Sequence, residues 1–175
     1  CSVIGSLSDP LSAKETPDKK PNLLVVMCDQ LREMSLSCSG DPNIHTPHID
    51  RLASEGIRFT RMYTPSPLCS PARASFHTGF YPHKVGFNYA NDTHLSQSHA
   101  TLAECLKAEG YVTGHIGKWH LNGTALSEDR YVPPQYHRGF DYWLGFEHGH
   151  TYFNSPHYGK TPEPIYPQEG VFETD

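Results

Sequence analysis

This sequence lacks the features that mark membrane-spanning and nucleic-acid-binding proteins. Its longest uninterrupted apolar run, residues 23–27, is far too short to cross a bilayer. Lys and Arg total 14 against 19 for Asp and Glu, so the formal net charge is −5 and no overall positive field attracts nucleic acid. With 37% hydrophobic residues, 14 Gly and 15 Pro, the composition predicts a globular, loop-rich chain without a transmembrane segment.

The sequence also has no C-x-x-C pair among its five cysteines, and no internal repeat. An odd count without such pairs argues against a disulfide framework and against a zinc ribbon. The simplest interpretation reserves one cysteine for chemistry. Cys28 and Cys105 stand in apolar patterns and are expected to be buried thiols.

The chain begins at Cys1 without a signal peptide, and residues 2–20 are polar and expected to be a disordered tether. A bacterial lipoprotein after signal cleavage would have this form, and so would an arbitrary starting point. Export to the periplasm or the cell surface, with Cys1 as a possible lipid anchor, is the expectation for localisation.

The hydrophobic pattern then predicts alternating strands and helices. Residues 22–28 form an apolar run typical of a strand buried on both faces, which places Asp29 at a carboxyl end where ligands bind in α/β sheets. Further elements are expected as follows: a helix from Pro47 to Gly56, a strand over 57–63, a helix from about Pro71, a helix with a capping box at Thr101 and Glu104, and a strand over 111–116. This order favours an α/β fold with a mostly parallel sheet, whereas residues after 121 are expected to form long loops.

One short segment combines a reactive side chain with a suitable position. Cys69 precedes the helix expected near Pro71, where the helix dipole and Arg73 would favour a thiolate. Taken alone, the pattern favours a buried thiol beside a surface arginine over a reactive cysteine.

The neighbours of Cys69 carry a resemblance to a known family. Cys69-x-Pro71-x-Arg73 is the C-x-P-x-R signature of type I sulfatases, in the alkaline phosphatase superfamily. Thr78-Gly79 fits the end of the longer signature, residues 110–120 resemble the second signature, and residues 46–56, 131–134 and 139–143 resemble other family segments. The resemblance covers nearly all of residues 22–160.

The resemblance implies an alkaline-phosphatase-like domain, with residues 21–175 as its N-terminal portion and the C-terminal remainder absent. In this family the signature cysteine is oxidised to formylglycine by a formylglycine-generating enzyme. A hydroxyl of the hydrated aldehyde, bound to one divalent metal, attacks sulfur, and the alcohol leaves. The second hydroxyl is then deprotonated, sulfate is expelled and the aldehyde is restored.

The same resemblance implies roles for single residues. Asp29 and the modified Cys69 would bind the metal, Ca²⁺ rather than Mg²⁺. Arg73 would hold the hydrated aldehyde, Lys118 would pair with a sulfate oxygen, and His120 is expected on the same side of an extended segment. Gln30, where relatives carry a second acid, is doubtful as a ligand.

Some of the family pattern is missing or different. His77 stands where the signature has an apolar residue, and the later metal ligands have no counterpart in residues 121–175. We therefore expect no activity from this chain alone. Residues 172–175 resemble the start of a further family helix. Residues 147–150, with His148 and His150, belong either to a substrate rim or to loop structure.

Three functions remain open at this stage. The first is hydrolysis of a sulfate ester on a small molecule or, more in keeping with the family, a glycan. The second is hydrolysis of phosphonate monoesters or phosphodiesters by the same modified cysteine. The third is non-catalytic binding of sulfated glycans with Cys69 as a thiol.

Overall fold

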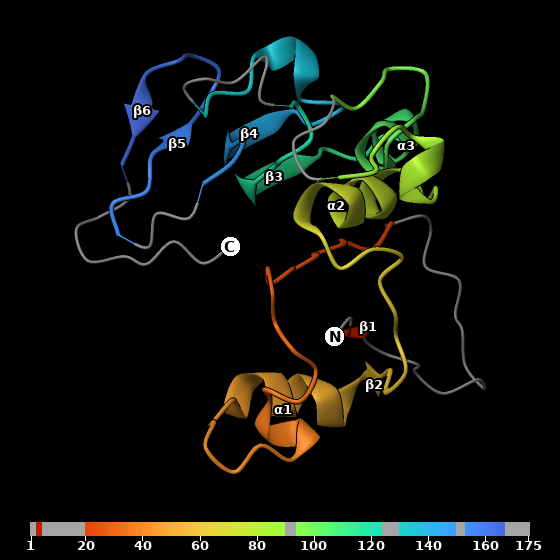
Figure 1. Ribbon diagram of the computed structural model, residues 1–175, viewed down its shortest axis with the longest axis vertical. Helices are drawn as coiled ribbons and strands as arrows, with labels where there is room; N and C mark the ends of the chain where they lie inside the picture. Colours follow the sequence, from red (N-terminus) through yellow and green to blue (C-terminus); the bar gives the residue numbers. More distant parts are fainter. Residues whose placement is uncertain (1–2, 5–19, 90–93, 124–129, 150–152, 167–175) are drawn as a thin grey trace. The chain divides into compact units, whose positions relative to one another are not determined.

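The computed structural model describes residues 3–4, 20–89, 94–123, 130–149 and 153–166 (Figure 1). The chain divides into two compact units, Cys1–Tyr63 and Thr64–Asp175. Most of the predicted tether, together with His150 and residues 172–175, lies outside the described residues.

The first unit is built around one helix. Helix α1, Pro47–Glu55, begins with proline at its first turn and is followed by Gly56, as the sequence predicts. The Asp50 carboxylate accepts hydrogen bonds from the Ser37 hydroxyl (2.5 Å), the Thr46 hydroxyl (2.9 Å) and the Cys38 N–H (3.0 Å). Asp50 thereby ties α1 to the short 3-10 helix η1, Ser37–Ser39.

The strands of the first unit are shorter than predicted. Strand β2 covers only Ile57–Arg58 and pairs antiparallel with β1, Val3–Ile4. Residues 22–28 form no strand, and Leu24 and Val26 are 85% and 77% exposed. A strand exists only where a neighbour supplies hydrogen bonds, and no described residue pairs with this segment. The same exposure overturns the expectation that Cys28 is a buried thiol.

The second unit contains a four-stranded sheet in the order β3-β4-β5-β6. The strands are β3, Gly114–Lys118; β4, Tyr142–Phe146; β5, His157–Tyr158; and β6, Pro164–Ile165. Only β3 and β4 are parallel, and the other two pairs are antiparallel. The α/β class is confirmed, but the sheet is mixed, and its last three strands lie where the sequence suggested loops.

Two helices accompany this sheet, α2, Cys69–Thr78, and α3, Leu102–Ala108, with the 3-10 helices η2, Pro82–Lys84, and η4, Pro134–Tyr136. Figure 1 shows α2 and α3 next to each other, and they are in contact. The core is a cluster of Ala74, Val85, Phe87, Leu95, Trp119, Leu121, Val132 and Trp143. One face of the β3–β4 pair joins this core through Trp143, while Ile116 and Tyr142 on its other face are exposed.

Helix α3 has the predicted capping box, but the expectation that Cys105 is a buried thiol is wrong. Thr101 and Glu104 exchange both capping hydrogen bonds, whereas Cys105 is exposed. Thr101 and Glu104 share one face of the helix because they are three residues apart. That face is turned towards Arg138, so the face carrying Leu102 and Cys105 points outward.

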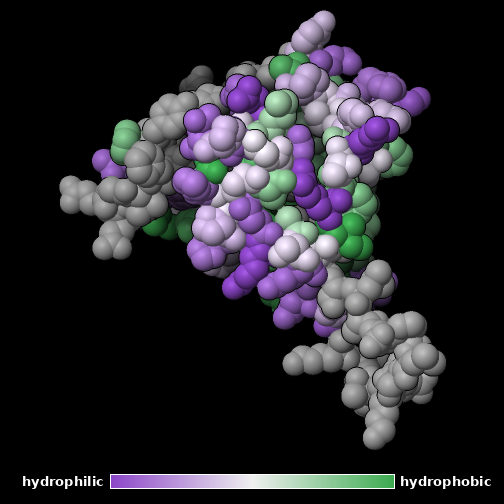
Figure 2. All heavy atoms as spheres, turned by 90° about the horizontal axis from the view of Figure 1, so that it is seen from below, coloured by the Kyte–Doolittle hydropathy of each residue, from purple (hydrophilic) through white to green (hydrophobic). Residues whose placement is uncertain are grey.

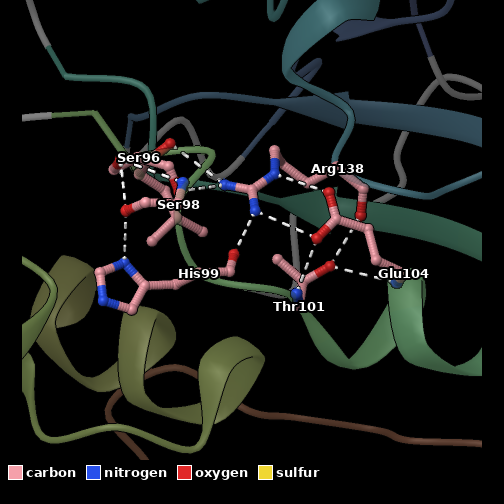
Figure 3. A network of polar contacts seen from close by, with 7 residues as sticks. Ser96, Ser98, His99, Thr101, Glu104 and Arg138 are labelled. Carbon is pink, nitrogen blue, oxygen red and sulfur yellow. Dashed lines mark hydrogen bonds and ion pairs between the residues drawn. The ribbon is translucent and has the colours of Figure 1, made fainter.

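Arg138 connects α3 to two loops (Figure 3). Its guanidinium donates to both Glu104 carboxylate oxygens (2.9 and 3.1 Å) and to the carbonyl oxygens of Leu95 (3.2 Å), Ser96 (2.8 Å) and His99 (2.5 Å). The next residue, Gly139, has φ +92°, and a Cβ there would lie 2.6 Å from the Glu104 nitrogen. Arg138 and Gly139 therefore form a close, fully hydrogen-bonded junction.

The surface mixes polar and apolar side chains, as the face drawn in Figure 2 illustrates. None of the helices within the described ranges combines the length and apolar character needed to cross a lipid bilayer.

Candidate active site

Cys69 is the first residue of α2 and is half-buried. The preceding Leu68 makes no side-chain capping bond, and Pro71 in the first turn has no N–H that would need a partner. The local sequence thus starts a helix at the cysteine and leaves the positive end of the helix dipole beside it.

Arg73 follows Cys69 by four residues and so lies on the same side of α2, one turn further along. It is 5% exposed, and its Nη1 donates to the Lys118 carbonyl oxygen at 2.5 Å. This bond joins the first turns of α2 to the end of β3.

Lys118 is the last residue of β3 and is 3% exposed. Its Nζ lies 4.0 Å from the Cys69 sulfur. Parallel strands β3 and β4 end together here, which is the edge where α/β sheets bind ligands. Two buried cations beside one nucleophilic position favour an anion that can accept charge-assisted hydrogen bonds.

His120 lies two residues beyond Lys118 but not on an extended strand. Its φ is +56°, so the chain turns at this residue and the predicted alternation of side chains does not apply. The imidazole is buried, and its ring centroid lies 6.3 Å from that of His148. His148 is thus beside a predicted site residue, as one of the two interpretations of residues 147–150 requires.

Glu147 is a site-adjacent residue that sequence reasoning did not single out by itself. It directly follows β4, is fully buried, and its Oε1 accepts a hydrogen bond from the Asn122 N–H at 2.7 Å. Burial raises the pKa of its carboxyl to about 7, and backbone hydrogen bonds from Asn122, Gly123 and Leu121 partly offset that rise. An acidic residue directly after a buried strand was the signal available in the sequence.

Beneath this site lies a layer of aromatic and imidazole rings. His77 on α2 packs against Trp119 with ring centroids 4.8 Å apart, and His115 on β3 stacks on Trp143 at 4.6 Å. Burial lowers the pKa of His77 to about 3 and that of His115 to about 4, so both are neutral at pH 7. His77 therefore serves as a core residue where the signature has an apolar one.

The predicted metal ligand Asp29 belongs to the first unit, where it is half-buried and follows the unpaired residues 22–28. Within the described part of the chain, no group of three or more His, Cys, Asp or Glu could hold a metal ion. Ca²⁺ takes about six to eight oxygen ligands, so these residues do not complete a metal centre by themselves. Gln30 has φ +54° in the turn after Asp29.

The arrangement around Cys69 can hold an anion against a nucleophilic position. Cys69, Arg73 and Lys118 come together from the start of α2 and the end of β3. Charge fixed in a buried site stabilises charge that develops during transfer of a sulfuryl or phosphoryl group.

Comparisons with known proteins agree with this geometry. The family model described as Sulfatase matches residues 21–172. The ulvan-active sulfatase of Formosa agariphila is 42% identical over 164 residues, which are 92% of this chain and 32% of that protein. The steryl-sulfatase of Mus musculus is 38% identical over 148 residues, 79% of this chain and 24% of that protein.

A solved structure shows that the fold is similar as well. BT4656 in complex with its substrate D-glucosamine-2-N,6-O-disulfate superposes with a TM-score of 0.72 at 33% identity, over 87% of this chain and 28% of that one. The chain thus spans a quarter to a third of the length of these relatives. The matched residues include the whole segment from Cys69 to His120. On these grounds the chain belongs to the sulfatase family.

Proposed function

We propose that the complete protein hydrolyses a sulfate ester on a carbohydrate, using formylglycine made from Cys69. The observation that carries the proposal is the approach of the buried Lys118 ammonium to the Cys69 sulfur, with Arg73 bonded to the same lysine. The carbohydrate is inferred from two relatives, one named as active on ulvan and one bound to a disulfated glucosamine.

The modified residue would supply an aldehyde whose hydrate provides an oxygen nucleophile for sulfur. Lys118 would donate a charge-assisted hydrogen bond to a sulfate oxygen as the ester bond breaks. Arg73 would hold the residue at position 69 from one turn along α2. His120 would bond the nucleophile or the sulfate. Loss of one such donor costs about 3–4 kcal/mol of transition-state stabilisation.

We propose Asp29 as one ligand of a divalent metal, because its carboxylate suits a hard cation such as Ca²⁺. Because the described residues gather no metal centre, we assign the metal no step. The chain spans a quarter to a third of the length of its relatives, so we propose that turnover of sulfate esters needs the complete protein. The further partners we propose are a sulfated glycan and, transiently, a formylglycine-generating enzyme; an extracellular glycan would also require export.

The first test is the mass of the tryptic peptide of residues 62–73, from protein made in its native host. A mass showing an aldehyde in place of the Cys69 thiol supports the proposal. An unmodified thiol, in a host that modifies its other sulfatases, refutes it and leaves sulfated-glycan binding as the remaining function.

The second test separates the two hydrolase reactions. The complete protein should cleave an aryl sulfate with higher kcat/KM than the matching aryl phosphonate monoester. The opposite order would assign the protein to phosphonate or phosphodiester hydrolysis.

A further inference from the structure

Glu147 is the fully buried carboxylate that holds the segment following His120. Its Oε1 accepts the Asn122 N–H at 2.7 Å, and the backbone of Leu121 and Gly123 also bonds it. Among the described residues none forms an ion pair with Glu147. Burying a carboxylate without a cationic partner is costly, so its backbone hydrogen bonds are its main compensation.

The segment that Glu147 holds is fixed from other directions as well. Leu121 and Asn122 are buried, and the Leu121 carbonyl accepts the Leu95 N–H at 2.7 Å. The Glu147 N–H donates to the Arg130 carbonyl at 2.8 Å, which anchors the carboxylate's own backbone at the end of β4. The Trp119 N–H donates to the Phe146 carbonyl at 2.8 Å, so β3 and β4 stay paired up to this point.

The residue between the paired strand and the held segment is His120, with φ +56°. A non-glycine residue persists in this left-handed region only where its surroundings determine its backbone on both sides. The β3–β4 pairing supplies one side, and the Glu147 hydrogen bonds to residues 121–123 supply the other.

We propose that Glu147 is a positioning residue that sets the backbone turn at His120 and so directs its imidazole into the site. The part of His120 in the reaction rests on the proposed function, whereas the geometry of the turn does not. Glu147 itself is fully buried, so we assign it no contact with substrate. A purely structural role would instead stabilise the fold without acting through His120.

The test uses the complete protein with Glu147→Gln and Glu147→Leu, alone and combined with His120→Ala. Gln keeps an amide oxygen that can still accept the Asn122 N–H, so Glu147→Gln should retain more activity than Glu147→Leu. A small displacement of a catalytic group can lower the reaction rate by up to about 100-fold. We therefore expect Glu147→Leu to lower kcat by about 10- to 100-fold, which is more than it changes KM. In the His120→Ala background the same substitution should cost almost nothing further.

Glu104→Gln is the matched control, because Glu104 also accepts a backbone N–H but does so at α3, bonded to Arg138. Glu104→Gln should lower thermal stability, and its effect on kcat should not depend on whether His120 is present. Equal losses of kcat from Glu147→Leu in the presence and absence of His120 would overturn the inference. So would loss of amide protection at residues 121–123 with unchanged kcat.

A readout without turnover keeps the inference separate from the proposed function. The NMR signals of the His120 imidazole should shift in Glu147→Leu and remain near wild type in Glu104→Gln. If wild-type protein proved inactive with Cys69 a thiol, the proposed function would fail, and these signals would still decide the inference. Unchanged His120 signals in Glu147→Leu would overturn it.

Discussion

Lys118 and Cys69 are 49 positions apart in the chain, yet the lysine Nζ lies 4.0 Å from the cysteine sulfur. The contact joins the end of β3 to the start of α2. It places a buried positive charge at the position from which the proposed nucleophile would act, so this lysine is the first residue to test.

We expect Lys118→Met in the complete protein to lower kcat/KM for an aryl sulfate by about 100- to 1,000-fold, because one donor to the developing charge is lost. Stability should stay the same or rise, since methionine fills similar space without a buried ammonium. Lys107→Met is the control, because Lys107 pairs with Asp141 at the surface. Wild-type turnover by Lys118→Met would contradict the role proposed for this lysine.

Arg73→Lys should reduce activity although it conserves charge, because lysine lacks the planar guanidinium that reaches the Lys118 carbonyl. A buried carbonyl left without its donor costs about 1–3 kcal/mol, which a urea unfolding curve would detect. The exposed Arg51, which pairs with Glu55, offers the same substitution as a control with little expected effect. Equal stability losses for the two variants would show that the Arg73 bond contributes little.

Arg138→Leu should destabilise the second unit without entering the chemistry. The change removes five hydrogen bonds, and three buried or half-buried carbonyls lose their donor. We expect a loss of at least about 2 kcal/mol in the free energy of unfolding, discounted for the partial exposure of Glu104. Circular dichroism melting measures it, and an unchanged melting temperature would contradict the role of this arginine as a junction.

Stability should fall with acid because His77 and His115 are neutral in the folded state. Their folded pKa values of about 3 and 4 lie below the ordinary value of 6.5, so protonation favours the unfolded chain. Below pH 6.5 each histidine therefore weakens folding by about 1.4 kcal/mol per pH unit, until its folded pKa is reached. Glu147, with a raised pKa, acts in the opposite direction between about pH 4.5 and 7.

The variant His77→Leu isolates one of these contributions. Between pH 4 and 6, it should reduce the slope of unfolding free energy against pH by the contribution of one bound proton, about 1.4 kcal/mol per pH unit. His83→Leu serves as the control, because it removes an exposed imidazole instead of a buried one. Identical slopes for wild type and His77→Leu would mean that His77 is not buried in neutral form.

Much of the second unit could be anticipated from spacing in the sequence. Pro71 and Arg73 after Cys69 specify a helix whose first turn carries the cysteine and whose next turn carries the arginine on the same side. The capping box at Thr101 and Glu104 is equally local. Such features need only near neighbours in the chain. The roles expected of Cys69, Arg73 and Lys118 come instead from the resemblance of residues 69–79 and 110–120 to the sulfatase signatures.

The outcome for residues 22–28 and for α3 depended on partners distant in the chain. An apolar run predicts burial, but only a neighbouring strand turns it into sheet, and none of the described residues supplies one. Cys105 faces outward because Arg138, more than thirty positions away, draws the Thr101 and Glu104 face of α3 inward.

Local spacing is therefore sufficient for the helix that begins at Cys69 and for the arginine one turn along it, because both depend on residues within a turn or two. The family follows instead from signature segments spread over residues 22–160. Packing in three dimensions alone determines the approach of Lys118 to Cys69, the left-handed turn at His120 and the buried carboxylate of Glu147 beside it. Each of these arises where the ends of β3 and β4 meet α2. Because these elements are far apart in the sequence, no local pattern predicts which of their side chains will be in contact.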